Sequence, residues 1–227
     1  MTLEDFVSRE QARRDIYRLL AACFCLPEKE ALLTERVFDN LSRAIKRVCP
    51  AAHAFVGKMK IAASTATEED LRVEYARLFV GPQELLAPPY GSVYLERERS
   101  VMGSSTIEVM KIYEGEGLFI DRESRELPDH ISVELEFVYY LISRELEALE
   151  AGKRSEALDY IQKQKHFLRE YVIPWAPSLC ADIRENTESE FFASLADCLR
   201  SLLQDSESEL QEPPKENLHG ESAEKVF

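Results

Sequence analysis

Residues 74–95 read EYARLFVGPQELLAPPYGSVYL, and this stretch organises our prediction of the fold. Its first half continues a helical pattern, in which Leu71, Tyr75 and Leu78 recur every three or four residues. Gly81-Pro82 ends that helix, because glycine accepts left-handed backbone angles and proline has no N–H to donate. The second half is rich in proline and apolar residues but has neither a helical nor a strand period. Since loops normally face water, we expect a packed, aromatic-lined loop that stays partly exposed and binds a segment of another protein.

Helical periodicity continues on both sides of this stretch, and no segment predicts a strand. The expected helices cover about 4–26, 29–48, 51–63, 68–81, 105–113, 130–150, 154–172, 178–185 and 188–204. Residues 205–227 lack apolar periodicity and carry mostly acidic charge. The sequence therefore predicts an all-α protein: a single globular domain of about nine or ten helices at 1–204, and an acidic, disordered C-terminal tail at 205–227.

The composition of the 227 residues favours a soluble protein with an acidic surface. Its 42 acidic and 28 basic side chains give a net charge of −14, which makes nucleic acid a poor partner and a basic peptide a good one. The simpler alternative is that the acids only keep the protein in solution. No apolar run is long enough for a membrane span, and the N-terminus does not resemble a signal peptide, so we expect a cytoplasmic protein.

The sequence contains no recognisable metal site. Cys23 and Cys25 lie two apart on an expected helix, so they point to different faces and cannot share a metal. None of the four histidines has another histidine or a cysteine at metal-ligand spacing. The five cysteines are expected to be free thiols, most of them buried; they are Cys23, Cys25, Cys49, Cys180 and Cys198.

Catalytic motifs are also absent from the sequence. It has no GxxxxGK[ST] phosphate loop, no GxGxxG, no HExxH and no GxSxG elbow. We therefore do not expect an enzyme, a cofactor or a metal. Two alternatives from other classes stay open: a small nucleotide-hydrolysing enzyme that uses Asp129 and His130, and a general helical scaffold protein.

A second notable run is LPDHISVELEF at 127–137. Asp129 can accept a hydrogen bond from an N–H in the first turn of the following helix, and Pro128 fixes the entry of the chain. His130 would then sit at the positive end of this helix as a neutral ring, with one donor and one acceptor for a peptide backbone. Capping and ligand contact are both open for this pair.

Glu74 likewise has two interpretations. It is either an ordinary acid on the helix surface or a carboxylate directed at an arginine of a bound partner. Arg77, three residues further on, favours the surface interpretation.

The two blocks together are similar to a known family. EYxRLFxGP at 74–82, APPYGSVYL at 87–95, MGxST at 102–106 and PDHIxxELEF at 128–137 resemble the TorD/DmsD/NarJ family of molybdoenzyme chaperones. The PPYGSVYL form is closer to the TorD and DmsD branch. Tyr90 stands where some members have Trp, and Gln83 where many have Gly, so the identity of the client protein stays open.

The resemblance implies an all-helical, TorD-like cytoplasmic chaperone. It implies binding of the twin-arginine signal peptide, and in some members of the body, of a molybdopterin oxidoreductase of the DMSO-reductase type. Such a chaperone assists cofactor insertion and delays export. A homodimer formed by domain swapping, with the connection at 114–129 as hinge, is compatible with it. The implied peptide-binding residues are Tyr75, Leu78, Phe79, Pro89, Tyr90, Gly91, Asp129 and His130.

Overall fold

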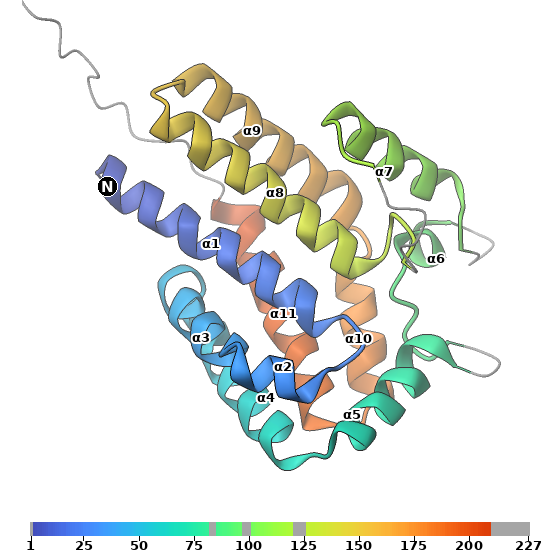
Figure 1. Ribbon diagram of the computed structural model, residues 1–227. Coiled ribbons are helices and arrows are strands. Elements are labelled where there is room, and N and C mark those ends of the chain that lie inside the picture. Colours follow the sequence, from blue (N-terminus) through green and yellow to red (C-terminus); the bar gives the residue numbers. More distant parts are fainter. Residues whose placement is uncertain (1, 82–84, 97–100, 120–125, 210–227) are drawn as a thin grey trace, which may run out of the picture.

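The computed structural model describes residues 2–81, 85–96, 101–119 and 126–209, and within them it is built of helices (Figure 1). The α-helices are α1 (Leu3–Cys23), α2 (Lys29–Thr34), α3 (Val37–Val48), α4 (His53–Thr65), α5 (Glu68–Tyr75), α6 (Gly91–Leu95), α7 (Ser104–Gly115), α8 (Ile131–Glu150), α9 (Arg154–Phe167), α10 (Ala176–Asn186) and α11 (Glu190–Glu209). No strand forms in these ranges beyond one isolated bridge between Tyr90 and His130. The prediction of an all-α fold is confirmed.

The helices pack around one apolar core. Helix α1 contacts α3 and α8, α8 also contacts α9, and α11 packs against α4 and α10. In Figure 1, α1, α8 and α9 run roughly alongside one another, and α7 lies at the edge of the molecule beside α6. The inner face expected for α8 is confirmed, because four side chains at helical spacing are fully buried: Ile131, Leu135, Val138 and Ile142.

The single helix that the sequence predicts at 29–48 is divided into α2 and α3 in the structure. Arg36 takes a left-handed backbone conformation, with φ of 56°, between α2 and α3. A non-glycine residue rarely adopts this conformation, which costs roughly 1–2 kcal/mol. Leu33, Val37 and Leu41 keep helical spacing across this interruption, so the sequence pattern does not reveal it.

The helix that leads into the loop starts and ends in distinct ways. Thr67 and Asp70 form a reciprocal capping box at the start of α5. From Ala76 to Val80 the helix widens into a π-helical turn, and the N–H of Gly81 donates to the carbonyl of Ala76 at 2.7 Å. Gly81 has φ of 55°, so the prediction that a glycine ends this helix is confirmed.

Further differences from the sequence prediction concern α6 and α11. The Pro-rich loop, expected to be non-helical, contains the short helix α6. Helix α11 continues to Glu209, five residues past the boundary at 204. The rest of the expected tail, 210–227, lies outside the described residues.

A polar cluster is buried between α1, α8 and α9. Glu145 is fully buried, and its Oε2 accepts a hydrogen bond from Gln164 Nε2 at 2.7 Å. Arg13 donates to Gln164 and lies 3.0 Å from Glu10. Burial raises the pKa of Glu145 to about 8, with the charge of Glu10 adding to the effect.

The raised pKa of Glu145 predicts that the folded protein loses stability as pH rises. The folded state holds this proton up to about pH 8, whereas the unfolded chain releases it near its ordinary value. The contribution of protonated Glu145 to the free energy of unfolding is therefore complete at low pH. It is lost as pH rises through the folded pKa, by at most about 1.4 kcal/mol per pH unit. Urea unfolding of the wild type and of Glu145→Gln between pH 5 and 8.5 should show the variant gaining relative stability as pH rises. Glu147→Gln, at an exposed position on the same helix, should run parallel to the wild type.

Candidate functional site

Two backbone hydrogen bonds join the Pro-rich loop to the start of α8. The N–H of Ile131 donates to the carbonyl of Pro89 at 2.8 Å, and the N–H of Gly91 donates to the carbonyl of Asp129 at 2.9 Å. They make the isolated antiparallel bridge between Tyr90 and His130. The two motif blocks, about forty residues apart in sequence, are therefore joined into one unit in the fold.

His130, and not Asp129, caps helix α8. Its Nδ1 accepts a hydrogen bond from the N–H of Ser132 at 3.2 Å and lies 2.7 Å from the Ser132 hydroxyl. Because Nδ1 accepts, the ring hydrogen sits on Nε2, which lies 3.5 Å from Glu126 Oε2. Burial lowers the pKa of His130 to about 4, so the ring is neutral at physiological pH, as the sequence predicts.

Asp129 caps the neighbouring helix instead of its own. Its Oδ2 accepts from the N–H of Ser92 in the first turn of α6 at 2.8 Å. The sequence prediction of a cap on the following helix is wrong, because α6 was not foreseen and supplies a competing N–H. The other oxygen, Oδ1, is buried and has no hydrogen-bond partner within the described residues.

Helix α6 rests on a buried carboxyl and an indole. Trp175 Nε1 donates to Glu134 Oε2 at 3.1 Å, and burial together with the charge of Asp129 raises the pKa of Glu134 well above its ordinary value. A Cβ at Gly91 would lie 3.0 Å from Trp175 Nε1, closer than real Cβ atoms ordinarily approach. Any larger residue at position 91 would therefore require the indole to shift by a few tenths of an ångström.

The predicted peptide-binding residues gather around this unit, but most of them are buried. Phe79 packs edge-on against both Tyr75 and Phe192 in the core, and the rings of Tyr75 and Phe192 are tilted relative to each other. Tyr90 is half-buried, and its ring packs edge-on against His130. Seven of the eight are buried, namely Tyr75, Leu78, Phe79, Pro89, Gly91, Asp129 and His130. In this conformation Tyr90 is the one that offers surface to a ligand, and the others hold the unit together.

Sequence reasoning missed two residues at the exposed rim of the site. Glu126 lies on an expected connector, and its Oε2 is 3.5 Å from the Tyr90 hydroxyl. Cys25, the exposed cysteine, donates a hydrogen bond to the carbonyl of Ala21 at 3.5 Å, and its pKa is raised mainly by partial burial. Burial raises the pKa of Tyr75, and the nearby Glu126, Cys25 and Tyr90 raise it further, so these four side chains lie in one neighbourhood. A carboxylate four residues before His130 is the only signal that the sequence offers for Glu126.

Tyr94 extends the site toward α10. Its ring stacks on Trp175 with centroids 5.7 Å apart, and its hydroxyl donates to Asp182 Oδ2 at 2.8 Å. Being half-buried, Tyr94 shares the expected loop surface with Tyr90.

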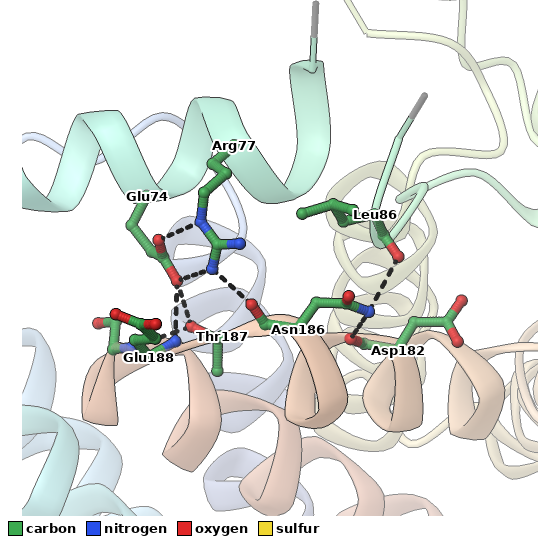
Figure 2. Close-up of polar contacts among 8 residues, drawn as sticks. Glu74, Arg77, Leu86, Asp182, Asn186, Thr187 and Glu188 are labelled. Carbon is green, nitrogen blue, oxygen red and sulfur yellow. Dashed lines mark hydrogen bonds and ion pairs between the residues drawn. The ribbon is translucent and has the colours of Figure 1, made fainter. Parts of the chain in front are cut away.

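Glu74 is a structural carboxylate that ties α5 to the turn before α11 (Figure 2). It accepts two hydrogen bonds from Arg77, both at 2.8 Å, and others from the Thr187 hydroxyl at 2.6 Å and the N–H of Glu188 at 3.2 Å. Arg77 also donates to the carbonyl of Asn186 at 2.5 Å. These bonds lower the pKa of Glu74, with Arg77 the largest cause, and they favour the surface interpretation over a role in binding a partner's arginine.

The described part of the chain holds no group of three or more metal-ligating side chains placed to bind a metal. Nor does any of its helices combine the length and apolar character that crossing a bilayer requires.

This fold and these joined blocks define a known class of helical proteins. The family described as the nitrate reductase delta subunit matches residues 7–181. The chain belongs to this family.

Its relatives include the probable Tat proofreading chaperone DmsD of Haemophilus influenzae, 29% identical over 129 residues, which are 57% of this chain and 56% of that protein. The perchlorate reductase assembly chaperone protein of Dechloromonas aromatica is 26% identical over 202 residues, 84% of this chain and 86% of that protein. Matches to two further relatives, DmsD of Salmonella typhi and TorD of a Psychrobacter species, span 61% and 63% of those proteins. The chain thus spans less than two thirds of several of these relatives.

A solved structure has the same fold. It is described as a redox enzyme maturation protein from Archaeoglobus fulgidus, with a TM-score of 0.50 and 23% identity, and it covers 84% of this chain and 93% of its own.

The burial of His130 predicts an unusual titration. Because its folded pKa lies well below the unfolded value, the stability that the neutral ring contributes is present above about pH 6.5 and is lost as pH falls toward 4. In ¹H–¹³C NMR spectra, the ring signal that disappears in His130→Asn should not move between pH 8 and pH 5.5. A midpoint near 6.5 for that signal would show that the ring is open to water.

Proposed function

We propose that this protein is a maturation chaperone that binds the twin-arginine signal peptide of a molybdopterin oxidoreductase of the DMSO-reductase type. Binding delays export while the cofactor is inserted. The proposal places the chaperone in the cytoplasm, where such enzymes are assembled. Relatives named as Tat proofreading and reductase assembly chaperones support this reading.

The observation that carries the proposal is a partly exposed rim on a hydrogen-bonded base. Tyr90 and Glu126 sit at the surface of a unit held by the backbone bonds between Pro89, Gly91 and the start of α8. A rim fixed in advance loses little conformational entropy when a peptide binds.

The chemistry of the rim fits a leader with a basic front and an apolar centre. The side chain of Glu126 is 36% exposed, so its carboxylate can accept a charge-assisted hydrogen bond from an arginine. The half-buried rings of Tyr90 and Tyr94 offer apolar surface beside it. The net charge of −14 favours encounter with a basic peptide.

The buried members of the predicted set support the rim without touching the peptide. Asp129 and His130 are each 1% exposed, and both use their side chains to cap helices. The same burial argues against hydrolysis by this pair, because a catalytic base must reach its substrate. Domain swapping about 114–129 stays a prediction, and residues 120–125 of that connection lie outside the described part.

Leader binding should depend on the two partly exposed rim residues, Tyr90 and Glu126. Calorimetry with a synthetic twin-arginine leader of a DMSO-reductase-type enzyme should give an affinity about 10-fold weaker for Tyr90→Ala, a loss of about 1.4 kcal/mol. Glu126→Gln should weaken binding and reduce the preference over a matched twin-lysine leader, because an amide lacks the charge that pairs with guanidinium. The exposed Glu150→Gln serves as a carboxylate control and should bind as the wild type does. Unchanged affinity for both rim variants, with normal unfolding curves, would exclude this rim.

Cys25 offers an independent readout of the same site. It is exposed, whereas Cys23, Cys49, Cys180 and Cys198 are buried, so a maleimide should label it first. Saturating twin-arginine leader should slow this labelling several-fold, because a peptide on the rim covers the thiol. Labelling at the same rate with and without bound leader would place the peptide elsewhere on the protein.

A further inference from the structure

A groove runs between α1 and α3, on elements that contribute little to the rim. Its volume is about 920 Å³. The apolar part of its lining is formed by Ala12, Leu19, Ala22, Val37 and Ala44, and the polar part includes Ser8, Gln11 and Asn40.

The charged part of the lining has the opposite sign to the protein as a whole. Five basic side chains line the groove, against the two acids Asp15 and Glu35, whereas acids outnumber bases by 42 to 28 in the whole chain. The basic residues are Arg14 and Arg18 on α1 and Arg43, Lys46 and Arg47 on α3. Both walls of the groove are therefore cationic.

Most of these cations are not neutralised within the protein. Arg14 pairs with Asp15 at 2.8 Å. Among the described residues, no carboxylate lies within 4.0 Å of a side-chain nitrogen of the other four. All four are exposed.

The dipole of α3 accounts for only part of this clustering. Lys46 and Arg47 lie in the last turn of α3, where basic side chains are favourable. Arg14 and Arg18 lie in the middle of α1 and gain nothing of this kind. The like charges on the facing helices repel one another, and an anionic ligand bound between them would reduce this repulsion.

The groove has the length and polarity for a short amphipathic helix. From Ser8 to Ala22 it follows α1 for roughly 20 Å, at about 1.5 Å per residue. An apolar floor between basic walls matches a helix with a leucine stripe flanked by acids, lying in the groove as helices do in other recognition sites. A small anion would leave the floor uncovered. Nucleic acid would meet the acidic remainder of the surface.

We propose that the groove between α1 and α3 binds an acidic amphipathic segment of a partner protein. The cationic walls select the acids, and the apolar floor takes the leucine or similar side chains. The proposal does not depend on leader binding, because it concerns different residues.

The test uses the full-length protein and three fluorescent 15-residue peptides. One carries a Leu stripe flanked by Glu, the second has Lys in place of Glu, and the third has Ser in place of Leu. Fluorescence anisotropy should show saturable binding of the Glu/Leu peptide only, weakening at least 10-fold between 50 and 300 mM NaCl as charges are screened. The double variant Arg43→Glu/Lys46→Glu should weaken it at least 10-fold.

The matched control changes the net charge equally but away from the groove. Lys58→Glu/Lys153→Glu disrupts two exposed ion pairs, with Glu190 and Glu156, and should keep binding within about 2-fold. The Arg43→Glu/Lys46→Glu variant should also keep its affinity for a twin-arginine leader, which separates this proposal from the one above.

Several results would overturn the proposal. Equal weakening by both double variants would mean that long-range charge alone acts. If the Lys/Leu peptide bound as strongly as the Glu/Leu peptide, the cationic walls would have no role in recognition. If the Glu/Ser peptide did so, the apolar floor would have none. Tighter binding of a single-stranded oligonucleotide would assign the groove to nucleic acid. A rise in affinity on deleting 210–227, or dilution-dependent dimers by light scattering, would assign it to this chain itself.

Discussion

The structure around the candidate site depends on the hydrogen bonds between Pro89 and Ile131 and between Gly91 and Asp129. They fix a proline-rich segment that has no long helix or sheet of its own to hold it. Because prolines cannot donate, this segment has few N–H groups with which to anchor itself. The start of α8 supplies the missing partners, and the side chain of Asp129 adds one more through Ser92. The rim is thereby built on a helix end and not on an independent loop.

This arrangement places ionisable groups where water is excluded. Glu134 and Asp129 are each 1% exposed, and among the described residues the indole of Trp175 is the one side chain that donates to Glu134. Burying a carboxyl is costly unless it is protonated or hydrogen-bonded, which is why the pKa of Glu134 is raised. The Glu145 cluster between α1, α8 and α9 follows the same rule at the other end of α8. Such groups specify a unique packing, since any shift leaves a charge or a donor without its partner.

The sequence predicts the helices well and their interruptions poorly. The spacing of Ile131, Leu135 and Val138 defines a buried face, and burial follows from it directly. The left-handed turn at Arg36 is not visible in the sequence, because the apolar period continues across it and arginine does not favour this conformation.

The two motif blocks are recognisable in the sequence, but the helices that their side chains cap are not. Which helix Asp129 caps depends on α6, a short helix formed by tertiary contacts and not by local preference. Glu126 and Cys25 reach the rim only through the folding of the whole chain, so periodicity could not reveal them.

The close approach of Gly91 to Trp175 also bears on how this sequence can diverge. The backbone of Gly91 packs directly against the indole of Trp175, which leaves little room for a side chain at position 91. Glu134 depends on the same indole for its hydrogen bond. A side chain at 91 would push the indole by a few tenths of an ångström, and such a shift weakens its hydrogen bond to the carboxyl of Glu134. A substitution at any one of these three positions therefore changes the packing or the hydrogen bonding at the other two, although 84 residues separate the first from the last.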